Sequence, residues 1–192
     1  MSAHPVSLAV AGCLAAMTAG TLAAQVVPTP AQTEGPYYPL VKPADTDPDL
    51  TRVGTGPPAR GEVLTLRGVV RDCLGNPVAG ARFEIWQTDF QGIYLHPGDG
   101  RTGQRDPNFQ FYGELRTDAQ GAYRFRTILP GPYTGRPRHI HAKVTPPGGS
   151  TRPPVTSAPP VVVTLPPVAL APPRALALPV ALSSSPPRAP VT

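Results

Sequence analysis

The chain has 192 residues, including 29 Pro and 19 Gly, and its 17 Lys and Arg exceed its 12 Asp and Glu. One residue in four is therefore Pro or Gly, which excludes a fold built on long helices. The net charge of +5 suggests a nucleic-acid partner, but every acidic and aromatic residue precedes His141 and four of the basic residues follow it. The first 141 residues are thus nearly neutral, and we predict no nucleic-acid binding.

Residues 1–24 contain an apolar, Ala-rich run that ends before Gln25. This pattern is typical of a secretory signal peptide and predicts export to the periplasm or the medium, with no stable membrane span after processing. A lipoprotein anchored at Cys13 is the alternative, although the apolar run continues well past that cysteine. Removal of residues 1–24 leaves only Cys73, so the processed chain is expected to contain no intramolecular disulfide.

The next segment, residues 25–60, is rich in Pro, Gly and Asp and has no periodicity. We expect it to form an extended lead-in that wraps the core. Alternating apolar and polar residues then predict five strands, at residues 64–70, 81–88, 112–117, 122–128 and 138–145. Turn signals between the first and second strands, and between the third and fourth, predict two hairpins.

The second predicted strand shows the alternation clearly: Phe83 and Ile85 fall on one face, and Arg82, Glu84 and Trp86 on the other. Short strands separated by turn residues favour an all-β fold, an antiparallel β-sandwich with long loops, over residues 61–149. The longest loop, residues 89–110, exceeds the usual length of a connection, which is typical of functional or disordered segments.

Two histidines, His139 and His141, occur on one face of the last predicted strand, where both imidazoles can bind one metal ion. Tyr133 lies six residues upstream at a Pro-Gly-Pro turn, and Tyr94 lies in the long loop. Phenolate is a hard anionic ligand, so a set of two Tyr and two His favours Fe(III). A solvated histidine pair and tyrosines packed at a sheet edge are the alternative interpretation. Arg136 is close enough in sequence to place a cation beside such a site.

Several motifs occur in a fixed order: TEGPYYP at 33–39, FEIWQ at 83–87, GIY at 92–94, DPNF at 106–109, FRTI at 125–128 and PGPY at 130–133, followed by Arg136 and HIH at 139–141. In order and spacing, residues 28–149 resemble the intradiol ring-cleavage dioxygenases, the family of catechol 1,2-dioxygenase and protocatechuate 3,4-dioxygenase.

The resemblance implies a mononuclear, non-haem Fe(III) site with Tyr94, Tyr133, His139 and His141 as ligands and hydroxide at the fifth position. It implies that Tyr133 is released when a catechol binds, and that Arg136 stabilises negative charge during attack by the co-substrate O₂. The ring of the small-molecule catechol would open to a muconate-type diacid. The resemblance also implies that Thr33, Pro36 and Tyr37 contact the substrate.

Beyond residue 149 the resemblance ends. Residues 150–192 are rich in Pro, Ala and Val, and we interpret them as a disordered tail or as the product of a shifted reading frame. We therefore expect the strand with the two histidines to have an exposed edge. A non-catalytic extracellular module of the carboxypeptidase-regulatory-like or transthyretin-like type, or an inactive truncated dioxygenase, also fits the strand pattern. The sequence allows an oligomer but does not specify one.

Overall fold

The computed structural model describes residues 27, 29–30, 33–133, 135–148, 161–164, 174–177 and 179–182. The predicted signal peptide and Cys13 lie outside these residues. Strands occur at all five predicted places: β1 (Val63–Arg71), β2 (Arg82–Trp86), β3 (Tyr112–Arg116), β4 (Ala122–Ile128) and β5 (His139–Thr145). The long loop between β2 and β3 contains two single turns of 3₁₀ helix, η1 (Pro97–Asp99) and η2 (Thr102–Gln104).

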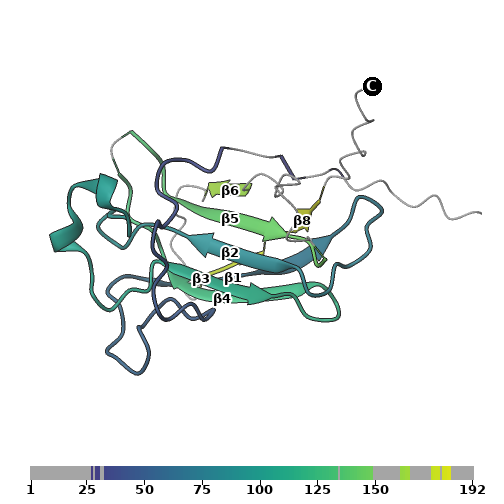
Figure 1. The fold of residues 1–192 in the computed structure, drawn as a ribbon, viewed down its shortest axis with the longest axis horizontal. Coiled ribbons are helices and arrows are strands. Elements are labelled where there is room, and N and C mark those ends of the chain that lie inside the picture. The colour runs from purple at the N-terminus through teal and green to yellow at the C-terminus, as the bar shows by residue number, and fades with distance from the viewer. Residues whose placement is uncertain are drawn as a thin grey trace, which may run out of the picture.

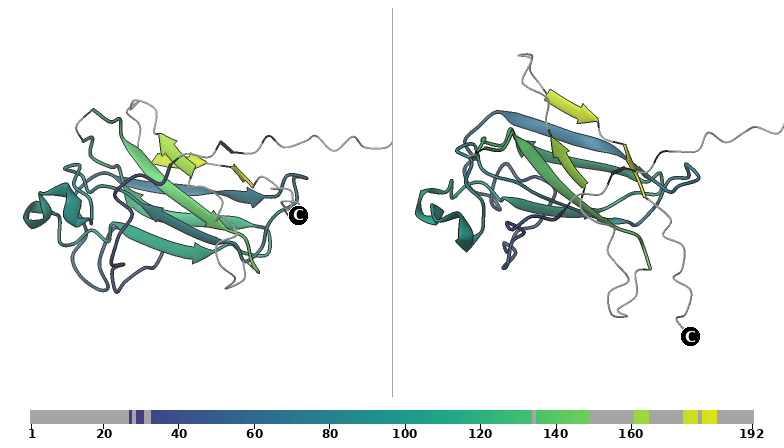
Figure 2. Two further views of the ribbon diagram at one scale, coloured as in Figure 1. Left: turned by 45° about the horizontal axis from the view of Figure 1, so that its top comes forward. Right: turned by 90° about the horizontal axis from the view of Figure 1, so that it is seen from above.

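Three short strands follow in the range for which the composition predicts disorder: β6 (Val161–Thr164), β7 (Arg174–Ala177) and β8 (Val180–Ala181). β6 pairs with β5 along residues 139–142, so β5 has a neighbour on each side and the predicted exposed edge is wrong. β7 and β8 both pair in parallel with β1, which makes the sheet of β1 a mixed one (Figure 2).

The strands form two layers, as expected for a β-sandwich (Figure 1). One sheet has the order β4-β1-β7, with β8 also paired to β1, and the other has the order β3-β2-β5-β6. Both predicted hairpins are wrong, because β1 pairs with β4 and β2 pairs with β3. The turns at residues 72–80 and 118–121 instead carry the chain from one sheet to the other. This arrangement lets the apolar face of each strand meet an opposing sheet, which a pair of isolated hairpins cannot do.

The core lies between the two sheets, and the predicted alternation in β2 is confirmed. Phe83 and Ile85 are fully buried against the other sheet, with Phe83 packed on Tyr123 and Phe125 of β4. Arg82, Glu84 and Trp86 point to the outer face. The two layers thus leave the outer face of the β3-β2-β5-β6 sheet available for polar and aromatic side chains.

Residues 33–60 run along this outer face and then along the side of the sandwich, where the Thr46 and Pro48 carbonyls accept from the backbone nitrogens of Glu114 in β3 and Arg126 in β4. Leu50 is fully buried in the core, its backbone nitrogen donates to the Arg126 carbonyl, and its own carbonyl accepts from Gln110. A Cβ on Gly113 of β3 would lie 2.6 Å from the Leu50 side chain, so the close passage of the segment requires glycine there. The segment is held against the sheet by its own packing and by backbone hydrogen bonds.

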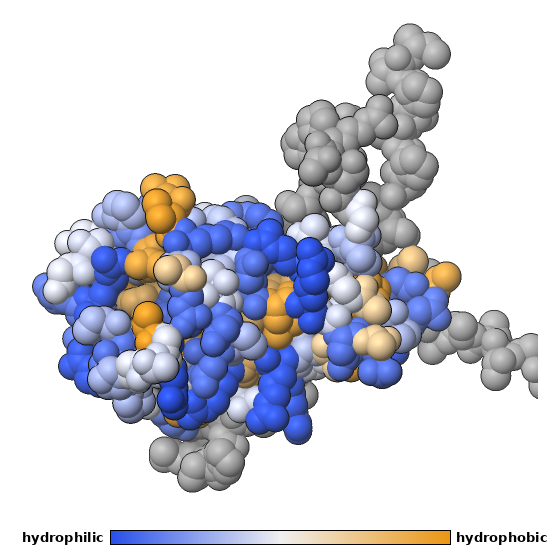
Figure 3. Space-filling view, turned by 60° about the horizontal axis from the view of Figure 1, so that its bottom comes forward, coloured by the Kyte–Doolittle hydropathy of each residue, from blue (hydrophilic) through white to orange (hydrophobic). Residues whose placement is uncertain are grey.

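Among the residues that the structure describes, few large apolar side chains are exposed, and these are Val27, Leu40, Val41, Val53, Val63 and Leu74. On the face shown in Figure 3, hydrophobic residues form small separate groups within a mainly hydrophilic surface. Within the described residues, no helix has the length and apolar character needed to span a membrane.

Candidate metal centre

The two histidines begin strand β5, next to the place where β2 ends, and the loop with η1 and η2 lies at the same end of the sandwich (Figure 1). His139 and His141 are both on the outer face, 4% and 5% exposed, with their ring centroids 4.9 Å apart. The period of a strand therefore places both imidazoles on one face, as the sequence predicted.

Tyr94 reaches this histidine pair from the long loop. Its hydroxyl oxygen lies 3.2 Å from Nε2 of His139 and 3.1 Å from Nε2 of His141, and the side chain is almost fully buried. Tyr133 is half-buried, with its ring centroid 5.4 Å from that of Tyr94 and 5.6 Å from that of His139. The structure thus brings together the four side chains that the sequence predicted as metal ligands.

A close backbone contact joins the two tyrosine-bearing loops. The Gly131 nitrogen donates to the Asp89 carbonyl, and a Cβ on Gly92 would lie only 2.2 Å from the Pro132 carbonyl oxygen. Gly92 also has a φ of 81°, in the region that glycine adopts readily. The loops can pack this closely only because both positions lack side chains, and this contact places Tyr94 beside Tyr133.

Asp89 organises the loop that presents Tyr94. It is fully buried, and its carboxylate accepts hydrogen bonds from the backbone nitrogens of Gln91, Ile93 and Asp106. The sequence analysis gave Asp89 no role, although an Asp followed by Gly three residues later is a recognisable turn signal. The carboxylate therefore supports the site without pointing into it.

The protonation pattern fits a cation between these groups. The Nδ1 hydrogen of His139 is donated to the Pro137 carbonyl at 2.7 Å, so Nε2 of a neutral His139 keeps its lone pair. The pKa of His141 is lowered to about 3, by burial first and then by its electrostatic interactions with His139 and Arg136, so this imidazole is neutral near pH 7. The single Tyr94 hydrogen can serve only one of the two Nε2 atoms, whereas a metal ion can bind all three groups.

The donor types of the four side chains can be compared with the preferences of metal ions. Burial raises the pKa of Tyr94, helped by the charge and hydrogen bond of Tyr133, so without a cation the phenol stays protonated. A bound cation would reverse this preference. Among the described residues, no three His, Cys, Asp or Glu side chains form a metal-binding group, so a four-ligand set at this place must include the tyrosines. Two phenols with two imidazoles fit Fe(III).

The remaining predicted residues lie around this centre with different degrees of contact. Tyr37 stacks on Tyr94 with ring centroids 4.7 Å apart and an interplanar angle of 15°. Thr33 and Pro36 are exposed in the same segment, and no role follows from their surroundings. Arg136 is exposed, and its backbone nitrogen donates to the Tyr133 carbonyl at 2.9 Å. Its charge is close enough to contribute to lowering the pKa of His141.

Farther along the same outer face lies a charged cluster made of Tyr38, Lys42, Arg82, Glu84, Tyr112 and Glu114. Glu84 is 2% exposed and accepts hydrogen bonds from Tyr112 at 2.6 Å, Tyr38 at 2.8 Å and Lys42 at 3.0 Å. Burial alone raises the pKa of this carboxyl, but the three hydrogen bonds and Arg82 lower it overall. Glu84 is therefore an ionised, fully paired carboxylate.

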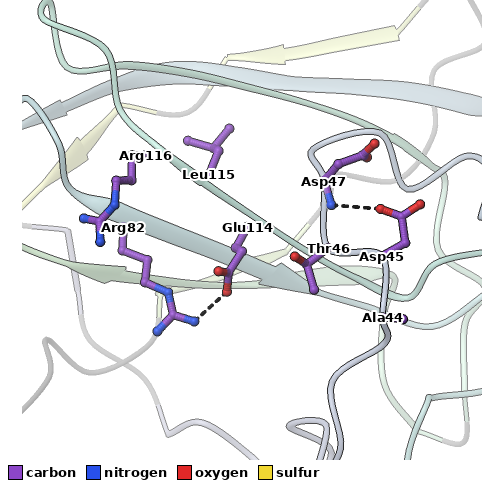
Figure 4. Close-up of a pocket in the computed structure, with 8 residues that line it drawn as sticks. All are labelled: Ala44, Asp45, Thr46, Asp47, Arg82, Glu114, Leu115 and Arg116. Atoms are coloured by element: carbon purple, nitrogen blue, oxygen red, sulfur yellow. Dashed lines mark hydrogen bonds and ion pairs between the residues drawn. The ribbon is translucent and has the colours of Figure 1, made fainter. Parts of the chain in front are cut away.

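One edge of the charged cluster borders a pocket of about 460 Å³. In Figure 4 the Arg82 guanidinium reaches the Glu114 carboxylate across β2 and β3, while Asp45 and Asp47 lie on the opposite wall. Asp45 accepts from the backbone nitrogens of Asp47 and Gly54. The acidic and basic groups of this wall are largely engaged with one another or with backbone, so the pocket offers no set of free ligands comparable with the histidine site.

Comparison with known proteins identifies the class. The family model described as "Dioxygenase" matches residues 33–146, more than half of the chain, and the curated relatives it resembles are intradiol enzymes. The chain belongs to the intradiol ring-cleavage dioxygenase family.

Two curated relatives show the extent of the match. The beta chain of protocatechuate 3,4-dioxygenase from Burkholderia cepacia is 38% identical over 128 residues, which cover 60% of this chain and 54% of the relative. Catechol 1,2-dioxygenase from Acinetobacter baylyi is 33% identical over 138 residues, covering 62% and 43%. The chain thus spans about half the length of these relatives.

Solved structures agree on the fold. The dioxygenase domain of a dioxygenase carbohydrate-binding protein fusion from Streptomyces sp. SirexAA-E superposes with a TM-score of 0.59 at 27% identity, covering 83% of this chain and all of that one. An intradiol ring-cleavage dioxygenase from Tetranychus urticae gives a TM-score of 0.51 at 26% identity, covering 64% and 61%. The β-sandwich of this chain is therefore that of the family.

Proposed function

We propose that the protein is an Fe(III)-dependent dioxygenase that opens a catechol-type ring between its two hydroxylated carbons. The observation that carries the proposal is the convergence of the Tyr94 hydroxyl and the Nε2 atoms of His139 and His141 within 3.2 Å, with Tyr133 beside them. Membership of the intradiol family supports the same reaction class. A non-catalytic spacer module has no need for this convergence.

In the proposed site, Tyr94, Tyr133, His139 and His141 hold one Fe(III). When bound, the iron would be chelated by the two catechol oxygens and would supply the chemistry that makes the ring reactive toward O₂, with both atoms of O₂ entering the ring-opened product. The two imidazoles are neutral donors, and the phenolates supply negative charge that offsets the cation. A catecholate dianion that replaces one phenolate and the hydroxide would therefore leave the net charge of the site unchanged.

The two tyrosines are suited to different tasks because their burial differs. Tyr94 is 1% exposed and packed under Tyr37, so it has no room to leave. Tyr133 is half-buried at a turn. We assign it as the group that swings away when the catechol binds, with its oxygen accepting one of the two catechol protons. If the displaced hydroxide accepts the other proton, the substrate can bind as a dianion at neutral pH.

The neighbouring residues orient the substrate. Arg136 places a positive charge at the site and, in the proposed role, stabilises negative charge on the ring during attack by O₂. Tyr37 covers Tyr94 and, with Thr33 and Pro36 in the same segment, is proposed to contact the substrate. This segment is held by Lys143, whose Nζ lies 3.0 Å from Glu34. The choice among catechols depends on this segment and on the adjoining loops.

The experiment is to load the full chain with Fe(III) and record its visible absorption, then its oxygen uptake with catechol. We expect a tyrosinate-to-iron charge-transfer band, one O₂ consumed per catechol, and a ring-opened diacid detected by mass spectrometry. The His139→Ala variant should lose the charge-transfer band and the activity. Tyr123 is a buried tyrosine of β4, and the Tyr123→Phe variant should keep both. A colourless wild-type protein that consumes no O₂ would contradict the proposal.

Export is a separate proposal and rests on residues 1–24 alone. Expression of the full chain in a bacterial host, followed by mass spectrometry of the periplasmic fraction, should show a chain that begins near residue 25. Recovery of the uncut chain from the cytoplasm would contradict it.

A further inference from the structure

The two histidines of the proposed site are held in different ways. The His139 ring is fixed by the hydrogen bond from its Nδ1 to the Pro137 carbonyl, which selects both its orientation and its tautomer. The Nδ1 atom of His141 is also buried, yet it has no hydrogen-bond partner among the described residues. The contact of its Nε2 with the Tyr94 hydroxyl lies on the side of the proposed metal, so no hydrogen bond from Nδ1 fixes the His141 ring as it fixes that of His139.

The His141 ring is instead constrained by Trp86, the last residue of β2. Its ring lies parallel to the His141 imidazole, with centroids 4.8 Å apart and an interplanar angle of 12°, and it is 1% exposed. The two residues are directly paired across the β2–β5 ladder, so the backbone fixes their separation. Rotation of the imidazole about its Cβ–Cγ bond would drive its edge into the indole.

Trp86 is itself held from the opposite direction. Tyr38 packs edge-on against it at 5.0 Å, and the Tyr38 hydroxyl donates to the buried Glu84 carboxylate at 2.8 Å. The indole nitrogen of Trp86 has no partner among the described residues, so it is packing that orients the ring. The charged cluster therefore fixes Tyr38, Tyr38 fixes Trp86, and Trp86 faces His141.

We propose that Trp86 is a positioning residue that orients His141 for iron binding by ring stacking, in place of the hydrogen bond that orients His139. The inference rests on the proposed Fe(III) site and adds a residue to which the sequence analysis gave no role. It requires a flat ring at position 86: phenylalanine can keep the stack, and leucine cannot.

The test compares Trp86→Phe and Trp86→Leu with Phe83→Leu, which shortens a buried aromatic on the opposite face of the same strand. The first measurement is the rate at which a chelator removes Fe(III) from the loaded full chain. We expect Trp86→Leu to release iron at least about tenfold faster than wild type. The rates of iron release from Trp86→Phe and Phe83→Leu should both stay within about threefold of the wild-type rate, although Phe83→Leu lowers the thermal stability.

The second measurement needs no iron. In the NMR spectrum of the iron-free protein, Trp86→Leu should shift and broaden the His141 imidazole signals, while those of His139, held by Pro137, stay unchanged. If wild type takes up no iron, the proposed function fails and this measurement still decides the inference. Equal iron loss from Trp86→Leu and Phe83→Leu, or unchanged His141 signals in Trp86→Leu, would overturn it.

Discussion

Two groups of polar side chains share the outer face of the β3-β2-β5-β6 sheet, and they are built in opposite ways. In the charged cluster, the Glu84 carboxylate is surrounded by donors, and Glu114 pairs with Arg82 at 2.5 Å. At the histidine site, two imidazole Nε2 atoms lie within hydrogen-bond distance of a single phenol hydroxyl, and one buried imidazole nitrogen has no partner in the described structure. Paired charges stabilise the fold, whereas groups left short of partners are available to a ligand.

The difference can be tested most strongly with two buried tyrosines, one from each group. Tyr94→Phe should weaken and shift the charge-transfer band, leaving only the contribution of Tyr133, and lower kcat at least about a hundredfold, because a ligand is lost, with little change in the stability of the iron-free protein. Tyr112→Phe should keep the colour but lose on the order of 2 kcal/mol of stability, since the hydroxyl that lies between the Glu84 and Glu114 carboxylates is removed. For each variant, the visible spectrum measures the charge-transfer band and denaturant unfolding measures the stability. The reverse pattern would show that the two groups have been assigned the wrong roles.

The charged cluster can be broken at its centre with Glu84→Ala. Removing the buried carboxylate leaves the Tyr38 hydroxyl without its acceptor and leaves Lys42 and Tyr112 with Glu114 alone, so we expect a loss of about 3 kcal/mol. Glu84→Gln keeps an acceptor oxygen and should cost less. Urea unfolding of the iron-free chain measures the effect, and equal losses for the two variants would show that charge, not hydrogen bonding, dominates.

At acid pH the charged cluster should lose part of its contribution to the stability of the fold. Hydrogen bonds from Tyr112 and Arg82 outweigh burial and lower the pKa of Glu114 to about 2, below its ordinary value of 4.5. A carboxyl with a depressed pKa stabilises the fold fully above pH 4.5, and this contribution is lost as pH falls from there toward 2. Thermal unfolding of Glu114→Gln should therefore vary less with pH in that window than wild type. Parallel profiles would contradict this assignment.

The smallest expected effect concerns the segment that crosses the sheet. Lys143→Gln removes the partly exposed ion pair with Glu34 and should cost less than about 1 kcal/mol, an effect that added salt reduces. Because this pair lies beside the segment that carries Tyr37, KM for catechol should rise more than kcat falls. Steady-state kinetics at low and high salt give both values. A fall in kcat with unchanged KM would show that the pair acts on chemistry instead.

The histidine pair shows how much of the site local sequence could predict. Their spacing of two places His139 and His141 on one face of any strand, whatever the rest of the fold. The identity of the tyrosines as hard ligands likewise followed from chemistry alone. That Tyr94 would reach the pair across 45 residues of sequence depended on the close contact of two glycine-containing loops, which no periodicity reveals.

The pairing of strands was beyond local reasoning for a related reason. The turns at residues 72–80 and 118–121 have the composition of hairpin turns, and turn residues specify only that the chain reverses. Whether the returning strand pairs with its predecessor or crosses to the other sheet depends on which apolar faces must be buried together. Phe83 on β2 packs against Phe125 on β4, in the opposite layer, and that contact favours the crossing.

The sequence by itself therefore determined the all-β class, the places of the first five strands, the neutral character of residues 1–141 and the four candidate ligands. These properties follow from residue type and period, which act over short distances. The tertiary structure alone decided the sheet order, the stacking of Trp86 on His141 and the difference in burial between Tyr94 and Tyr133. These depend on contacts between segments far apart in the chain, where burial and close packing, not local pattern, set the free energy.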